Sequence, residues 1–201
     1  MKNMIWALLA LTVSSLASAG EFVITHHDYS GIWIEYTGYV EMDDHEMLAA
    51  IMTAADGDQV FITINSGGGS AYGGIALFWE AERHQNLTTI AGADYGAWSA
   101  ASMFWMGSPR DWFEGADAKV GVHQAYCNSY YPPGCDLTHF RARYIEALNR
   151  AGYQGYIFDH WLTAAQQGYG VSAWALLTDE GWFFHESRLH ITYPINPSWT
   201  Y

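Results

Sequence analysis

Apolar residues recur along this chain with two different periods, one typical of strands and one typical of helices. Residues 21–25 and 31–40 are rich in β-forming side chains and predict two strands. Between residues 43 and 55 the apolar positions recur at helical spacing after an acidic start, which favours a helix N-terminus. Residues 60–64 then form a nearly continuous apolar run, as expected of a strand buried on both faces of a parallel sheet.

The alternation of strand and helix continues into the middle of the chain. A glycine-rich turn at residues 65–70 precedes a predicted helix at residues 71–84 and a predicted strand at residues 87–91. Residues 118–122 predict another short strand. This order of elements is typical of an α/β fold with right-handed crossovers. Because the chain has 201 residues and half of them are apolar, we expect a single domain.

The second half of the chain is rich in aromatic residues. Residues 137–150 and 156–166 predict helices. Residues 194–199 predict an irregular tail, because two prolines interrupt the segment. Packing in the core accounts for most of the aromatic side chains.

The first nineteen residues have the pattern of a secretory signal peptide. Lys2 precedes an apolar stretch, and Ala17 to Ala19 provide the small residues that a signal peptidase requires. A retained membrane anchor is less favoured, since the apolar stretch is short for a bilayer. We therefore expect residues 1–19 to be removed after Ala19, leaving residues 20–201 as the mature domain of a periplasmic or secreted protein.

Two cysteines fit an exported chain. Cys127 and Cys135 enclose a turn-rich loop that can bring them together, and the compartment outside the cytoplasm is oxidising. A disulfide across so short a loop would stabilise the fold by roughly 2–3 kcal/mol. Two thiols alone make neither a zinc site nor a C-x-x-C redox pair. We therefore expect a structural disulfide.

Charge and motif spacing exclude several classes of ligand. The chain has 21 acidic residues against 8 Lys and Arg residues, so we expect no nucleic acid partner. Adjacent residues of an extended chain point to opposite faces, so His26, His27 and Asp28 predict a polar hairpin tip and not a metal site. The glycines at residues 67–69 lack both the lysine of a phosphate loop and dinucleotide-binding spacing. We therefore expect neither a metal nor a cofactor.

A small-residue run beginning at Ser99 is the strongest candidate for chemistry. Ser99 and Ser102 lie where an extended segment enters an apolar helix, and the free amides of a helix N-terminus favour developing negative charge. His123 directly follows the short strand at residues 118–122 and is a candidate general base. The upstream glycine turn can present a backbone N–H to an oxyanion. These groups together predict a nucleophilic site.

The order of these segments resembles the Clp serine peptidase family. That family has a strand ending in Ile-Asn-Ser-Pro-Gly-Gly-Ser, a serine about thirty residues later, and a histidine at the end of a short strand. Residues 64–70 match the first segment with glycine in place of proline, and the likeness extends over residues 34–124. It is best with exported members of the Clp/crotonase superfamily. The resemblance implies a Clp/crotonase-like ββα spiral in a single α/β domain.

The resemblance also implies roles for individual residues. Ser99 lies 31 residues after Gly68 and 24 before His123, each within one residue of the family spacing, so it is the expected nucleophile. Ser102 is the alternative and needs a slip of about one helical turn. The amides of Gly68 and Ala100 are the expected oxyanion donors.

The third member of a catalytic triad is not evident in the sequence. The family places an aspartate before the step that opens a late helix, and no carboxylate precedes the matching Leu177 and Thr178. Asp179 and Asp159 are weak candidates, and a Ser-His dyad is the other possibility.

The resemblance implies an exported serine peptidase that acts on peptides or proteins and forms homo-oligomers. We expect no ATP-driven unfoldase as a partner, because such partners are cytoplasmic. One alternative is a binding or assembly protein that kept the fold and lost the chemistry. Another is crotonase-type chemistry on a thioester, which the scarcity of basic residues disfavours.

Overall fold

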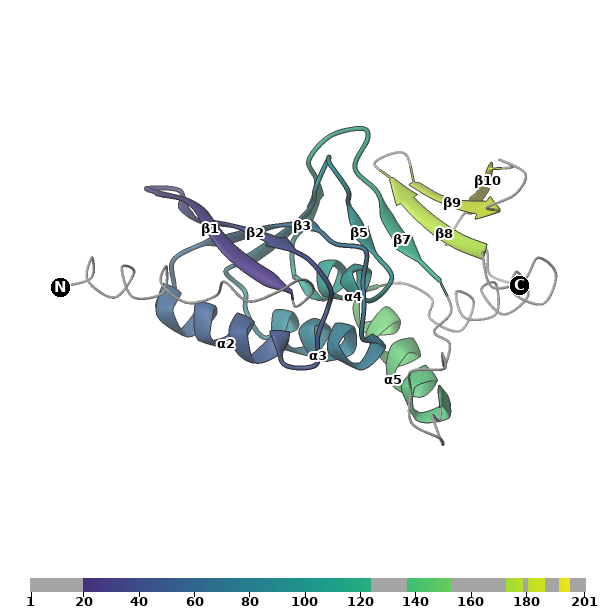
Figure 1. Ribbon diagram of the computed structural model, residues 1–201, viewed down its shortest axis with the longest axis horizontal. Coiled ribbons are helices and arrows are strands. Elements are labelled where there is room, and N and C mark those ends of the chain that lie inside the picture. Colours follow the sequence, from purple (N-terminus) through teal and green to yellow (C-terminus); the bar gives the residue numbers. More distant parts are fainter. Residues whose placement is uncertain (1–19, 124–136, 153–172, 179–180, 187–191, 196–201) are drawn as a thin grey trace.

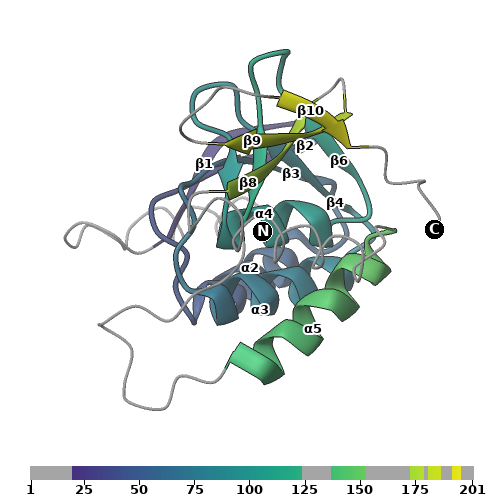
Figure 2. The ribbon, with the colours of Figure 1, turned by 90° about the vertical axis from the view of Figure 1, so that its right-hand side faces the viewer.

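The computed structural model describes residues 20–123, 137–152, 173–178, 181–186 and 192–195. Two five-stranded sheets, ordered β1-β2-β3-β4-β6 and β10-β9-β8-β7-β5, form the β part of the fold. Helices α2, α3 and α5 lie on one side of the strands, and α4 lies beside α3 (Figure 1, Figure 2). The elements are β1 (Glu21–Asp28), β2 (Gly31–Thr37), α2 (Asp44–Ala55), β3 (Val60–Asn65), α3 (Ala71–Glu82), β4 (Leu87–Ala91), β5 (Ala97–Trp98), α4 (Ala100–Gly107), β6 (Asp111–Phe113), β7 (Val120–Val122), α5 (Leu137–Arg150), β8 (Ala173–Thr178), β9 (Gly181–Glu186) and β10 (Thr192–Ile195).

The first sheet is mostly parallel. Strand β1 is antiparallel to β2, whereas β2, β3, β4 and β6 run parallel to one another. Helix α2 connects β2 to β3, and α3 connects β3 to β4, as the alternating pattern of the sequence predicted. Strand β4 is buried along its whole length, including the polar Thr88 and Thr89, whereas β3 alternates buried and half-buried positions and is not buried on both faces as its apolar sequence predicted.

The second sheet carries the segments around the candidate site. Strands β5 and β7 are parallel, and β7, β8, β9 and β10 follow one another in antiparallel pairs. A parallel bridge between Ser66 and Ala97 joins the end of the first sheet to β5. The two sheets therefore meet at the glycine turn.

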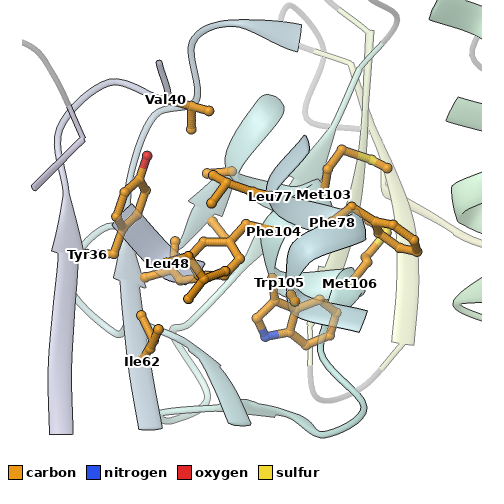
Figure 3. Packing of buried hydrophobic residues seen from close by; sticks show 14 of the residues in the cluster. Tyr36, Val40, Leu48, Ile62, Leu77, Phe78, Met103, Phe104, Trp105 and Met106 are labelled. Atoms are coloured by element: carbon orange, nitrogen blue, oxygen red, sulfur yellow. The ribbon is translucent and has the colours of Figure 1, made fainter. Parts of the chain in front are cut away.

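The core lies between the parallel strands and helices α2, α3 and α4 (Figure 3). Phe104 of α4 is fully buried, and its ring packs edge-on against Tyr36 of β2 at 5.5 Å between centroids. Helices α3 and α4 approach closely, because a Cβ atom on Gly74 would lie 2.5 Å from the Ala100 carbonyl oxygen. Gly107 has the same relation to the Phe78 carbonyl, so the two helices cross at small residues.

Most elements predicted from the sequence are confirmed within one to three residues. The predicted strand at residues 31–40 is shorter, because Gly38 turns the chain with a φ of 87°. The prediction of a hairpin tip at His26, His27 and Asp28 is wrong, since these residues belong to β1 and the turn follows them. Asp28 accepts hydrogen bonds from the Ser30 amide and hydroxyl, which closes the turn later than expected.

The C-terminal part differs more from expectation. The prediction of an irregular tail is wrong for its first two residues, because Pro194 and Ile195 pair with β9 in β10. Leu177 and Thr178 end strand β8 and do not open a helix. The helix predicted at residues 156–166 lies outside the described residues. In the part of the chain that the structure describes, no helix is long and apolar enough to cross a membrane, and no cluster of His, Cys, Asp or Glu could hold a metal ion.

Candidate active site

Asn65 and Ser66, at the end of β3, fasten the glycine turn to the segment before β5. The Asn65 side-chain oxygen accepts hydrogen bonds from the amides of Tyr95 and Gly96, at 3.0 and 3.3 Å. The Ser66 amide donates to the Gly96 carbonyl, and the Ser66 carbonyl accepts from the Trp98 amide, each at 2.9 Å. The turn is therefore held beside the residue that precedes Ser99.

Val40 holds the other side of the glycine turn. Its amide donates to the Gly68 carbonyl at 3.0 Å, and its carbonyl accepts from the Ser70 amide at 2.8 Å. Ser70 then caps α3 by accepting a hydrogen bond from the Gly73 amide. Gly68 has a φ of 92°, and a Cβ atom there would lie 2.5 Å from the Cβ of Ser99. Only glycine satisfies both the backbone angle and this close approach.

Ser99 occupies the N-cap of α4 in a conformation that L-residues rarely adopt, with φ 54° and ψ −120°. Its amide donates to the Gly121 carbonyl at 2.7 Å. Its carbonyl accepts from the Ser102 amide at 3.1 Å and from the Ser102 hydroxyl at 2.5 Å. The backbone of Ser99 is therefore fixed on both sides, and its side chain projects from a strand-to-helix turn.

Strand β7 brings His123 to this serine. Because β5 and β7 are parallel and pair Trp98 with Gly121, the residues that follow each strand leave the sheet at the same edge. The distance between Ser99 Oγ and His123 Nε2 is 2.6 Å. A Cβ atom on Gly121 would overlap the Trp98 ring, so glycine at this position lets the two strands approach with the indole between them.

The other predicted site residues have distinct positions. Ser102, the alternative nucleophile, is fully buried, and its hydroxyl is directed at the Ser99 carbonyl. Ala100 is the first residue of α4, so its amide has no acceptor one turn earlier in the helix. The Gly68 amide donates to Ser66 Oγ at 3.2 Å, and that hydroxyl donates to the Gly38 carbonyl at 2.7 Å.

Four predicted residues lie outside the described residues: Asp159, Asp179, Cys127 and Cys135. The sequence did not lead us to predict that Asn65, Ser66 and Ser102 hold the site in place through hydrogen bonds to the backbone. A signal for the first two was present, because Asn and Ser at a strand end before glycines are typical of side chains that bond to nearby backbone.

Aromatic side chains flank the glycine turn. Tyr39 and Tyr95 are 59% and 60% exposed although both lie against glycines of this turn. A Cβ atom on Gly67 would lie 3.3 Å from the Tyr95 hydroxyl, and one on Gly69 would lie 2.9 Å from the Tyr39 ring. Two exposed tyrosines therefore flank the glycine turn, whose Gly68 contacts Ser99.

The parallel sheet with its helical crossovers and the junction of the two sheets define the Clp/crotonase-like class of α/β fold. One similar solved structure is a mutant of the 1510-N membrane-bound stomatin-specific protease. It aligns with a TM-score of 0.52 at 14% identity, over 73% of this chain and 72% of the other. At this identity the likeness shows the fold alone.

Two further solved structures align with TM-scores of 0.49. A mutant of ClpP1 from Listeria monocytogenes is 13% identical, over 69% of this chain and 87% of the other. Another mutant of the stomatin-specific protease, in complex with a substrate peptide, is 15% identical over 68% and 70% of the two chains. No protein-family model matches the chain, and a search of curated proteins finds no match.

Proposed function

We propose that this protein is a serine hydrolase that cleaves peptide bonds, with Ser99 as nucleophile and His123 as general base. The observation that carries the proposal is the 2.6 Å separation of Ser99 Oγ and His123 Nε2 at a strained strand-to-helix turn. His123 Nε2 would take the hydroxyl proton as Oγ attacks the substrate carbonyl carbon. The same nitrogen would return that proton to the leaving amine, and water would then hydrolyse the acyl-enzyme.

Two backbone amides support the tetrahedral intermediate in this proposal. The Ala100 amide is at the N-terminus of α4, where the helix dipole favours negative charge. The Gly68 amide bonds to Ser66 Oγ at 3.2 Å, a long contact that a charged oxyanion would replace or share. Removal of one preorganised donor from the oxyanion hole of a serine protease costs about 2.7–4 kcal/mol of transition-state stabilisation.

The substrate class, assembly and location belong to the same proposal. Peptides or proteins are the expected substrates, which agrees with the protease activity named for the structure of similar fold. We expect removal of residues 1–19, export, a homo-oligomeric assembly, and no dependence on an ATP-driven partner.

Labelling with a fluorophosphonate probe tests the nucleophile directly. We expect the parent protein to be labelled and Ser99→Ala to lose the label, because the probe reacts with an activated serine hydroxyl. Ser102→Ala is the matched control: it removes the neighbouring hydroxyl but keeps the Ser102 amide bond to the Ser99 carbonyl, so it should be labelled more slowly than the parent without losing the label. His123→Ala should lower both labelling and peptide hydrolysis by at least a hundredfold. Equal labelling of Ser99→Ala and the parent would contradict the proposal, and a protein without any turnover sensitive to His123 would favour the binding or assembly alternative.

A further inference from the structure

The start of β1 places Gly20 against a buried carboxylate. Residue 20 precedes Glu21, which pairs with Thr37 of β2. The ring of Phe22 packs on Tyr36 with 4.6 Å between centroids, which anchors this end of the strand in the core. A Cβ atom on Gly20 would overlap both Asp44 Oδ2 and the Tyr36 hydroxyl, so glycine is needed where the chain passes these two groups.

Asp44 is unusual for a first-turn helix residue because its side chain is only 5% exposed. Its Oδ2 atom accepts hydrogen bonds from the Tyr36 hydroxyl at 2.6 Å and from the Glu41 amide at 2.8 Å. Among the residues that the structure describes, no Lys, Arg or His nitrogen forms an ion pair with it. Burial raises the pKa of Asp44 above its ordinary value, and the hydrogen bonds from Tyr36 and Glu41 and the neighbouring His45 offset only part of that rise.

A free amino group at residue 20 would supply the missing cation. From the position of the absent Cβ, the Gly20 nitrogen lies within about 5.5 Å of Asp44 Oδ2. Rotation about the Cα–C bond of a terminal glycine can carry the ammonium group toward the position that a Cβ would occupy, next to that oxygen. In the unprocessed chain the same nitrogen is a neutral amide, which brings no charge to the carboxylate.

We propose that cleavage after Ala19 creates an ion pair between the new α-ammonium group of Gly20 and the buried carboxylate of Asp44. The proposal rests on the proposed signal cleavage and is independent of the hydrolase chemistry. It makes Gly20 and Asp44 a binding site for the processed chain terminus, so that the mature protein is more stable than any form with residues left before Gly20. A buried charge without a partner is strongly destabilising, so a form of the chain that lacks the ammonium group leaves the cost of burying Asp44 uncompensated.

Chemical acylation tests the proposed ion pair without any substitution, on the protein that is exported after expression of the whole 201-residue chain. Residues 20–201 contain a single lysine, Lys119, which is exposed and serves as an internal reference. We expect mass spectrometry to find Gly20 as the first residue, and its α-amine to be acylated at least tenfold more slowly in the folded chain than in urea. Lys119 should react at similar rates in both states. A Gly20 amine that reacts as fast when folded as when unfolded, or a mature chain that starts elsewhere, overturns the proposal.

A double-variant comparison separates charge from bulk. Chains 20–201 and 19–201 differ by one alanine, and we expect the shorter chain to unfold several degrees higher in temperature. Asp44→Asn keeps an acceptor for Tyr36 and Glu41 but removes the charge, so it should abolish most of that difference. A difference that persists unchanged in Asp44→Asn reflects bulk alone and overturns the ion pair. Chains carrying Ser99→Ala should behave as the parent, which keeps this result distinct from the fate of the hydrolase proposal.

Discussion

At the scale of single residues, Ser99 combines a reactive side chain with a strained backbone. Its φ of 54° costs on the order of 1–3 kcal/mol in a residue with a Cβ atom. Two sets of hydrogen bonds offset that cost: the Ser99 amide donates to the Gly121 carbonyl, and the Ser99 carbonyl accepts from the amide and hydroxyl of Ser102. A glycine would relieve the strain but would remove the hydroxyl that meets His123. Strain kept at a residue with this partner is consistent with a functional role.

Gly68 is the residue whose replacement should damage the site most selectively. In Gly68→Ala the new methyl would lie 2.5 Å from Ser99 Cβ and 2.6 Å from the Trp98 carbonyl oxygen, so the turn and the serine must separate. We expect the rate of peptide hydrolysis to fall at least tenfold and the free energy of unfolding to fall by about 2–4 kcal/mol. Steady-state kinetics and urea unfolding measure the two effects.

Gly57→Ala is the matched control for Gly68→Ala. Gly57 has a φ of 90°, close to that of Gly68, but a Cβ atom there would meet nothing within 4 Å. Its replacement should cost about 1–2 kcal/mol for the backbone angle alone and leave the rate of hydrolysis unchanged. Equal losses of activity in the two variants would mean that the close approach of Gly68 to Ser99 is unimportant.

At the scale of elements, the turn of the β1–β2 hairpin is closed by one solvent-accessible carboxylate, that of Asp28. The Ser30 hydroxyl and amide donate to Asp28 and lower its pKa to about 2, with a smaller contribution from His26. Because the pKa is lower in the folded state than its ordinary value of about 4, the carboxylate stabilises the hairpin above pH 4. That contribution is lost as the pH falls from about 4 to about 2.

An NMR titration of the Asp28 carboxyl carbon measures this effect. We expect an apparent pKa near the value of about 2 in the parent and a higher pKa in Ser30→Ala, because both the hydroxyl donor and the turn geometry change. His26→Gln should raise the pKa less, since its contact with Asp28 at 3.1 Å makes a smaller contribution. An unchanged pKa in Ser30→Ala would show that the Ser30 hydroxyl does not stabilise the ionised form of Asp28.

At the scale of the whole molecule, one aromatic cluster joins the strands to the helix of the candidate site. Phe104 of α4 packs against Tyr36 of β2, with centroids 5.5 Å apart (Figure 3). The ring of Phe104 also lies against Phe22 of β1, with centroids 6.1 Å apart. We expect Phe104→Ala to lower the free energy of unfolding by about 3–5 kcal/mol, because the deleted ring leaves a cavity in a buried site.

The loss of Phe104 should also leave unfolding cooperative, because the aromatic cluster connects the first sheet to α4 and both unfold together. Tryptophan fluorescence and far-UV circular dichroism should report a single urea transition that moves to lower urea in Phe104→Ala. Tyr29→Ala is the control, since Tyr29 is fully exposed and its loss should change stability by no more than about 0.5 kcal/mol. A loss below about 1 kcal/mol in Phe104→Ala would contradict this picture of the core.

The local pattern of apolar and polar residues was sufficient to predict most helices and strands of the fold. The apolar run at residues 60–64 and the helical spacing at residues 43–55 identified β3 and α2, because burial selects residues with the period of the element. Pattern failed at β10, where Pro194 is typical of loops and a pairing with Phe183 of β9 prevails. It also failed at β5 and β6, which are two and three residues long and carry too few positions for a period.

The sequence by itself determined the alternation of elements, the glycine turn and the spacing of Ser99 and His123, since these follow from residue type and order along the chain. Only the tertiary structure decided the 2.6 Å approach of the two side chains, the strained angle of Ser99, and the place of Ser102 behind it. The physical reason is that these features depend on the parallel pairing of β5 with β7 and on contacts between Gly68 and Ser99. Such contacts join residues 23 to 31 positions apart, and no local preference of either segment specifies them.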